Sequence, residues 1–263
     1  MGAAKKHGPR ERLSTGIPGL DDMLHGGFLP RTTNLVEGAP GCGKTTLGMQ
    51  FIHHGALHGE PGLIVTFEQF PQQYYRDADS FGWDFRELER QDLLQVIMSS
   101  PEVTKADLER FNGRIESLIT RLGAKRILVD SLSHFERVTE DPVEFRTIIH
   151  GFLNSLKREG LTVILTREAS ALLGDVEEEE SDASIGFLVD SYILLRYVEI
   201  ESAIRRAIVV LKMRGSAHDT HIRQFDIGSK GFYVEGPFKG REGIMSGTPQ
   251  QMAESFIRAF IQR

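Results

Sequence analysis

Short apolar runs alternate with longer segments of helical periodicity between residues 13 and 200. The runs are rich in aliphatic and β-branched residues and predict strands at Thr33–Glu37, Leu63–Phe67, Leu94–Met98, Arg126–Val129, Thr162–Thr166 and Ser191–Tyr197. Strands that alternate with helices predict an α/β fold with a mostly parallel central sheet flanked by helices. After residue 200 consecutive strands follow, at Ala207–Met213, Ile222–Ile227 and Gly231–Val234. These predict a C-terminal antiparallel extension of the sheet.

Apolar residues at helical spacing predict the helices between these strands. One helix is expected from Thr104 to Leu122, because Asp107 follows Thr104 at the spacing of a capping signal. Its apolar stripe contains Leu108, Phe111, Ile115, Leu118, Ile119 and Leu122. Another helix is expected to begin at Asp141, with Pro142 at the first helical position.

The two ends of the chain differ from the segment between them. Residues 1–12 are rich in Gly, Lys and Arg and predict a flexible basic tail. Residues 13–247 form the predicted α/β domain. Residues 248–263 predict a C-terminal amphipathic helix, with Thr248 and Gln251 as a capping box. The apolar stripe of this helix packs either on its own domain or on a neighbouring subunit, and the sequence leaves both open.

Charge is distributed unevenly along the chain, which has 263 residues and a net charge of −6. Six of the 37 acidic residues lie in one stretch, 175–182, and the remaining acidic residues equal the 31 basic ones in number. A neutral body and an acidic stretch that repels phosphate argue against nucleic acid as a partner. We expect the stretch to be a mobile solvated loop or, alternatively, a docking patch for a protein partner.

Cysteine content and hydropathy bear on location. The single cysteine, Cys42, excludes an internal disulfide and fits a reducing compartment. The chain has no apolar run near the roughly 18 residues that a membrane-spanning helix needs. The first residues lack the apolar core of a secretory signal. The expected location is therefore the cytoplasm, away from membranes.

Residues 38–45 form a complete phosphate-binding loop of the GxxxxGK[ST] type. A predicted strand precedes the loop, and a predicted helix from Lys44 to about Leu57 follows it. Glycines let consecutive backbone N–H groups point at phosphate oxygens, while Lys44 contacts the β- and γ-phosphates and Thr45 ligates Mg²⁺. The expected nucleotide-binding residues here are Gly38, Ala39, Pro40, Gly41, Cys42, Gly43, Lys44, Thr45 and Thr46.

Two carboxylates follow predicted strands. Asp130 ends the apolar run Ile127–Val129 and is expected to help Thr45 hold Mg²⁺. Glu68 follows the strand Leu63–Phe67 and can polarise the attacking water, because strand ends carry ligand chemistry in open α/β sheets. Glu68 is also a candidate metal ligand. A solvated acid at a strand end is an equally simple interpretation of Glu68.

Longer motifs resemble the KaiC family of RecA-superfamily ATPases. The segments that carry the resemblance are Ser14–Asp21, His25–Gly27, Val65–Glu68, Ser80–Asp84, Ile193–Glu199, Leu211–Asp219 and Ser246–Pro249. The resemblance implies a RecA-like P-loop NTPase fold with ATP and Mg²⁺ as ligands. Circadian members of the family contain two such domains in tandem and this chain contains one, so we expect a single-domain KaiC-like ATPase.

The resemblance also implies residues that act across a subunit interface, because the family forms hexameric rings with ATP between subunits. Lys212 and Arg214, with Met213 between them, would reach the phosphates of the neighbour's ATP as an arginine-finger-like device. The residues implied near the same nucleotide from that side are Ser216, His218 and Arg206, and those implied near its base or ribose are Ser80 and Phe81. By the same resemblance Glu68 becomes the general base. The residue pattern alone is also consistent with a solvated hairpin around Lys212, Arg214 and His218.

The chain departs from the family pattern at two places. Family members often carry two adjacent acids after the Thr-Phe pair, and here the second position is Gln69. Its loss predicts slow hydrolysis. The hydroxyl pair that the autokinase half of circadian members phosphorylates corresponds to Gly186 and Phe187, so autophosphorylation at that pair is not expected.

These observations lead to one hypothesis with two alternatives. The chain binds Mg·ATP and hydrolyses it slowly at the interfaces of a homo-hexameric ring that acts as a nucleotide-dependent switch, with Lys44, Glu68, Lys212 and Arg214 as catalytic residues. One alternative is a RecA-like DNA-binding recombinase. The other is a protein kinase or autokinase that acts at a different hydroxyl.

Overall fold

A single large sheet forms the centre of the computed structural model, which describes residues 11–108, 113–139, 141–169, 185–238, 241–242 and 250–251. In this part of the chain the sheet has nine strands in the order β3-β2-β4-β5-β1-β6-β7-β8-β9. The strands are β1 (Thr33–Gly38), β2 (Gly62–Thr66), β3 (Leu94–Met98), β4 (Arg126–Asp130), β5 (Thr162–Glu168), β6 (Ser191–Ile200), β7 (Ala203–Met213), β8 (Arg223–Gly228) and β9 (Gly231–Pro237). Strands β1 to β6 pair in parallel, and β7 to β9 extend the sheet in antiparallel fashion. The expected mixed sheet is confirmed.

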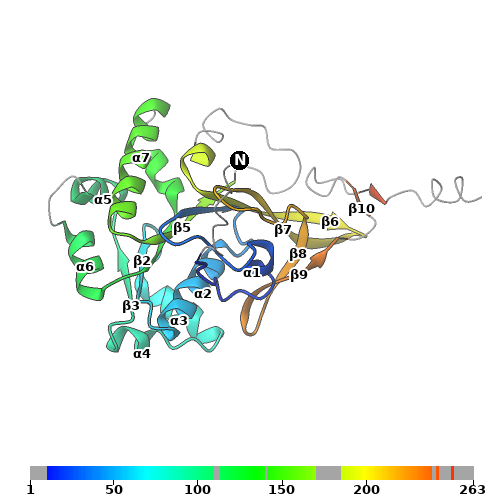
Figure 1. The fold of residues 1–263 in the computed structure, drawn as a ribbon, viewed down its shortest axis with the longest axis horizontal. Helices are drawn as coiled ribbons and strands as arrows, with labels where there is room; N and C mark the ends of the chain where they lie inside the picture. Colours follow the sequence, from blue (N-terminus) through cyan, green and yellow to red (C-terminus); the bar gives the residue numbers. More distant parts are fainter. Residues whose placement is uncertain are drawn as a thin grey trace, which may run out of the picture.

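Helices cover both faces of the parallel strands (Figure 1). Successive strand residues point to opposite faces, so that Val36, Ile64 and Leu128 face one apolar layer while Leu35, Leu63 and Ile127 face the other. The first layer includes α1 (Leu20–Met23), α2 (Lys44–Leu57), α3 (Pro71–Ser80) and α4 (Phe85–Arg90). The second includes α6 (Arg114–Leu122), α7 (Pro142–Arg158) and the 3-10 helix η1 (Leu132–Arg137). None of the helices that the structure describes is long and apolar enough to span a membrane.

Two helices begin where the sequence predicts. α2 begins at Lys44 and ends at Leu57. α7 begins at Pro142, and the side chain of Asp141 accepts a hydrogen bond from the Val143 N–H at 2.9 Å. This carboxylate satisfies one of the N–H groups that the first turn of a helix leaves unpaired.

The continuous helix expected from Thr104 to Leu122 is wrong. The structure contains two helices, α5 (Pro101–Leu108) and α6, and Gly113 before α6 has an extended backbone with ψ of 167°. Asp107 caps the second helix rather than the first: its carboxylate accepts the N–H groups of Arg114 at 2.6 Å and Ile115 at 2.8 Å. A continuous apolar stripe therefore concealed a break at a glycine. Phe111 lies outside the described residues.

The predicted terminal segments are only partly described. The guanidinium of Arg12 donates to the carbonyls of Leu24 and Gly27 at 3.1 Å, so the end of the predicted tail is tied to the domain. Gln250–Gln251 form strand β11, which pairs with β10 (Arg241–Glu242), where the sequence predicts a helix. The other residues of that helix, residues 1–10 and the acidic stretch 175–182 lie outside the described residues.

Arg126, the first residue of β4, connects three segments that are far apart in the sequence. We predict that its replacement destabilises the fold. Its side chain is 2% exposed and donates to Glu60 and to the carbonyls of Ser14 and Phe51. Arg126→Ala leaves buried carbonyls without donors, so we expect the free energy of unfolding in urea to fall by about 3 kcal/mol. Glu60→Gln removes only the charge of a half-buried partner and should cost less. Equal losses in the two variants would show that the buried carbonyl contacts of Arg126 add nothing to its ion pair.

Candidate functional site

The carboxyl ends of four neighbouring strands meet around one cavity of about 370 Å³. Thr66 at the end of β2 lies opposite Asp130 at the end of β4, and Gly38 at the end of β1 lies opposite Glu168 at the end of β5. The predicted residues that line this cavity are Pro40, Gly41, Gly43, Lys44, Thr45, Thr46, Glu68 and Asp130. The sheet register therefore brings the loop, the two predicted carboxylates and Lys44 together.

The loop after β1 requires glycine at two positions. Gly41 and Gly43 have positive φ angles of 75° and 104°, a region that residues with a Cβ rarely adopt. A Cβ at Gly43 would also come within 2.6 Å of the side chain of Ile227. Cys42, between them, is buried, and burial raises the pKa of its thiol. The thiol therefore stays protonated and serves as a small apolar spacer.

Lys44 is buried against the loop that precedes it. Its side chain lies in the interior at 7% exposure, and Nζ donates to the carbonyls of Gly38 at 2.8 Å and Ala39 at 3.0 Å. No carboxylate among the described residues forms an ion pair with it. This arrangement places a positive charge beside the N-terminus of α2, where backbone N–H groups also favour an anion.

Three hydroxyl groups surround the carboxylate of Asp130. Thr45 Oγ1 donates to Oδ2 at 2.8 Å, the Tyr74 hydroxyl donates to the same oxygen at 2.7 Å, and Thr166 donates to Oδ1. Burial and the adjacent Asp130 raise the pKa of Tyr74, so this hydroxyl remains a donor. The adjacent hydroxyl and carboxylate oxygens of Thr45 and Asp130 are the ligand types that Mg²⁺ prefers. The side chains present therefore fit a magnesium site.

Glu68 extends into the cavity from a short turn after β2. Thr66 Oγ1 accepts the backbone N–H groups of Glu68 at 3.4 Å and Gln69 at 3.2 Å, which fixes the turn. The Glu68 side chain is 68% exposed and lies 3.5 Å from Nε2 of His134 in η1. A solvated carboxylate on a fixed turn can reach a water or a ligand in the cavity.

Lys212 and Arg214 lie at the opposite edge of the sheet. Lys212 pairs with Tyr192, which stands beside Leu35 near the start of β1, whereas the loop begins after Gly38. At a rise of about 3.3 Å per residue, roughly 10 Å of strand separates these levels before the turn of the loop is added. Lys212 Nζ donates to the carbonyls of Gly186 and Val189, and Arg214 donates to the Phe187 carbonyl. Neither side chain contacts the cavity of its own chain.

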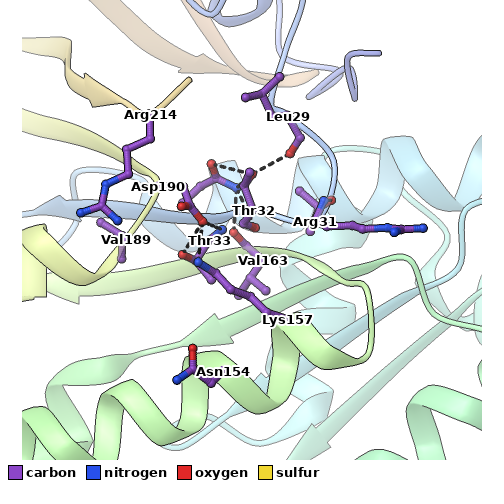
Figure 2. Close-up of polar contacts among 12 residues, drawn as sticks. Leu29, Arg31, Thr32, Thr33, Asn154, Lys157, Val163, Val189, Asp190 and Arg214 are labelled. Carbon is purple, nitrogen blue, oxygen red and sulfur yellow. Dashed lines mark hydrogen bonds and ion pairs between the residues drawn. The ribbon is translucent and has the colours of Figure 1, made fainter. Parts of the chain in front are cut away.

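The ion pair between Asp190 and Lys157 supports the backbone that carries Lys212 and Arg214. Figure 2 shows Asp190 between Lys157 of α7 and Thr33 at the start of β1. The Asp190 carboxylate accepts the Thr33 N–H at 2.9 Å and contacts Lys157 Nζ at 2.9 Å, while its carbonyl accepts the Arg214 N–H at 2.8 Å. Burial opposes the charged form, but these hydrogen bonds lower the pKa of Asp190. Burial and the nearby Arg214 lower the pKa of Lys212.

Ser216 and His218 follow on the same segment, next to Met213. Arg12 donates to Ser216 Oγ and approaches the sulfur of Met213, so the N-terminal segment supports this loop. His218 Nδ1 is buried and has no hydrogen-bond partner among the described residues. The structure therefore keeps Lys212, Met213, Arg214, Ser216 and His218 together on one segment.

Arg206 lies apart from this group within the chain, and its expected place near a neighbour's nucleotide stays a prediction. It pairs with Tyr197 on β6 and Phe225 on β8, nearer the other end of β7, and forms an ion pair with Asp226 at 2.5 Å. The Tyr197 hydroxyl lies beside the loop of the same chain, since a Cβ at Gly41 would come within 3.3 Å of it. Arg206 and Lys212 are six residues apart on β7, about 20 Å at the rise of an extended strand, so Arg206 stands beside its own loop.

Ser80 and Phe81 are not brought to the cavity either. Ser80 is the last residue of α3, and its Oγ donates to the carbonyl of Asp77 at 2.6 Å. The Phe81 ring packs on Trp83, with ring centroids 4.7 Å apart. Neither residue lines the cavity described above.

Several residues of the cavity escaped sequence reasoning. They are Thr66, Tyr74, Ser131, Glu168 and Ile227; Gln69, discussed above as the position of the missing second acid, also lines the cavity. Tyr74 comes from α3, which the sequence did not predict, and Ile227 comes from β8, far along the chain. Glu168 carried the same signal as Glu68, an acid at the end of an apolar strand, and could have been found by it.

Comparison with known proteins shows which family the chain is similar to. A family model described as "ATPase: KaiC" matches residues 13–237. The chain is 38% identical to circadian clock protein KaiC3 of Synechocystis sp. over 94% of its length, and 38% identical to circadian clock oscillator protein KaiC of Thermostichus vulcanus over 92%. It is 37% identical to KaiC of Synechococcus elongatus over 92% of its length. The chain spans about half the length of these relatives, 48%, 46% and 46% respectively.

We predict that Tyr74→Phe destabilises the protein through Asp130. The variant removes one of the three hydroxyl donors to a carboxylate beside a buried ring, so the free energy of unfolding should fall by about 1.5–3 kcal/mol in urea. Tyr75→Phe is the matched control, because it removes the same hydroxyl from a partly exposed contact with Glu89. A loss in Tyr75→Phe as large as that in Tyr74→Phe would refute the importance of the Asp130 contact.

Proposed function

The chain belongs to the KaiC family of ATPases, whose domain is RecA-like, and on this premise we propose that it binds Mg·ATP and hydrolyses it slowly at the subunit interfaces of a homo-hexameric ring. The observation that carries the proposal is the cavity in which Lys44, Thr45, Asp130 and Glu68 converge at the end of the sheet. Nucleotide binding would make the ring a switch between two assembly states.

Phosphate binding follows from the loop and Lys44. The backbone N–H groups at the start of α2 would cradle the phosphates, and Nζ of Lys44 would exchange its two loop carbonyls for phosphate oxygens. Thr45 and Asp130 would hold the metal. Bound Mg²⁺ supplies charge neutralisation to the phosphates.

Hydrolysis requires an oriented water. In the proposed step the water oxygen forms a bond to the γ-phosphorus while the bond to the bridging oxygen breaks, and ADP leaves with that electron pair. Glu68 accepts the proton of the attacking water and passes it to solvent, to which its carboxylate is open. The base therefore regenerates without a further group.

Lys212 and Arg214 would complete the site from a neighbouring chain. They stand at the edge opposite their own loop, and Lys212, Arg214 and the loop cannot meet within one chain. A head-to-tail contact places the edge of one subunit against the cavity of the next, and such contacts form a ring when the rotation between neighbours closes. Two positive charges at the γ-phosphate would then stabilise the charge of the transition state.

The first test measures phosphate release together with mass by light scattering, with and without Mg·ATP. We expect the wild type to form a nucleotide-stabilised hexamer that releases phosphate, and Glu68→Gln to keep the hexamer with turnover reduced roughly 100-fold. Glu235→Gln, an exposed acid on β9, is the control and should match the wild type. A monomeric wild type contradicts the ring, and normal turnover in Glu68→Gln contradicts the assignment of the base.

The second test asks whether Arg214 acts across the interface. Lys44→Ala and Arg214→Ala should each be inactive alone, but their equimolar mixture should recover about a quarter of the wild-type rate, because random mixing pairs an intact loop with an intact Arg214 at that frequency. The control mixes Arg214→Ala with the double variant Lys44→Ala/Arg214→Ala, which supplies no intact Arg214. Recovery in the control, or none in the first mixture, would refute action in trans.

A further inference from the structure

Glu168 lines the same cavity as Glu68. Glu168 ends β5, whereas Glu68 follows β2, and these two strands lie on opposite sides of β4. Strands β2 and β5 flank β4 in the sheet. Thr66 on β2 lies opposite Asp130, and Thr166 on β5 donates a hydrogen bond to Asp130. Two residues beyond each threonine stands a glutamate, Glu68 on one side and Glu168 on the other. The two acids therefore occupy matching positions around the Asp130 strand.

The spacing of the two glutamates suits one small molecule between them. Their strands are separated by two strand intervals, about 10 Å, and both side chains line the same cavity. At this separation the two carboxylates can hold one water molecule between them when neither side chain extends fully toward the other. Within the described part of the chain, no residue donates a hydrogen bond to the Glu168 carboxylate.

The backbone of Glu168 is fixed while its side chain stays available. Its N–H donates to Ser133 Oγ at 2.9 Å. The preceding residue, Arg167, points to the other face of the strand and is buried, where it bonds Glu136 at 3.0 Å and Glu37 at 3.4 Å. η1 thus supports both acids, since Ser133 contacts the backbone of Glu168 and His134 contacts the side chain of Glu68.

We propose that Glu168 is a second catalytic residue, which accepts a hydrogen bond from the attacking water opposite Glu68. This inference rests on the proposed ATP hydrolysis. A water whose two O–H groups are held by two carboxylates has its lone pair directed at the γ-phosphorus. Glu68 still takes the proton of the attacking water. Glu168 only orients that water and keeps its own protonation state. Glu168 takes the place of the second acid that Gln69 does not provide.

The test compares steady-state ATP hydrolysis by Glu168→Gln, Glu68→Gln and the double variant in the assembled protein. We expect Glu168→Gln to lower kcat at least about tenfold with KM for ATP changed less than about twofold. Because both acids hold one water, the double variant should lose much less than the product of the single losses. Glu159→Gln, at the exposed end of α7, is the control and should keep wild-type kinetics.

Three other results would overturn the inference. If Glu168→Gln matches the control while Glu68→Gln is impaired, Glu168 has no part in catalysis and the proposed function stands. If Glu168→Gln changes the mass of the assembly at unchanged kcat, it is an interface residue instead. If the wild type itself releases no phosphate, the proposed function fails and this inference fails with it.

Discussion

The parallel register of β2, β4, β5 and β1 is the constraint on which the site depends. Parallel pairing forces the carboxyl ends of these strands to one edge, where β2, β4 and β5 end in Thr66, Asp130 and Glu168 and β1 leads into the loop. Asp130 then becomes the centre, because hydroxyls from α2, α3 and β5 converge on its carboxylate. A slip of one residue in β4 would turn Asp130 to the other face of the sheet and remove its hydrogen bonds to the three hydroxyl groups.

The switch to antiparallel pairing at β7 places a second group of cationic residues at the opposite edge of the sheet. β7 runs back from the level of the loop to the start of β1, so Lys212 and Arg214 arrive where Asp190 binds Thr33 and Lys157. A strand that continued in parallel would have delivered these cations to the same edge as the loop. If a site is shared between two chains, the loop and the pair Lys212 and Arg214 must lie at different edges of each chain.

The local parts of the site could be predicted from the sequence, and the long-range parts could not. Lys44 and Thr45 lie in a motif whose geometry is set by neighbouring glycines, and Asp130 ends an apolar strand, so their positions at the cavity could be predicted without tertiary information. The distance between Arg206 and Lys212 could not be predicted, because the position of a residue along β7 relative to the loop depends on pairing with β6 that the sequence does not reveal. The break at Gly113 was missed because apolar periodicity continued across it.

The two edges are joined by β1, and this gives the proposed ring a physical route between neighbouring sites. At one end β1 leads directly into the loop, and at the other the Asp190 carboxylate accepts the N–H of Thr33, while the backbone carbonyl of Asp190 accepts the N–H of Arg214. A buried strand in the middle of the sheet is too well packed to deform gradually. In the proposed ring, β1 is therefore the segment that would connect a change at the loop with the residues facing the next subunit. In a closed ring each such strand would couple one site to the next, so the sheet that builds the site would also link the sites together.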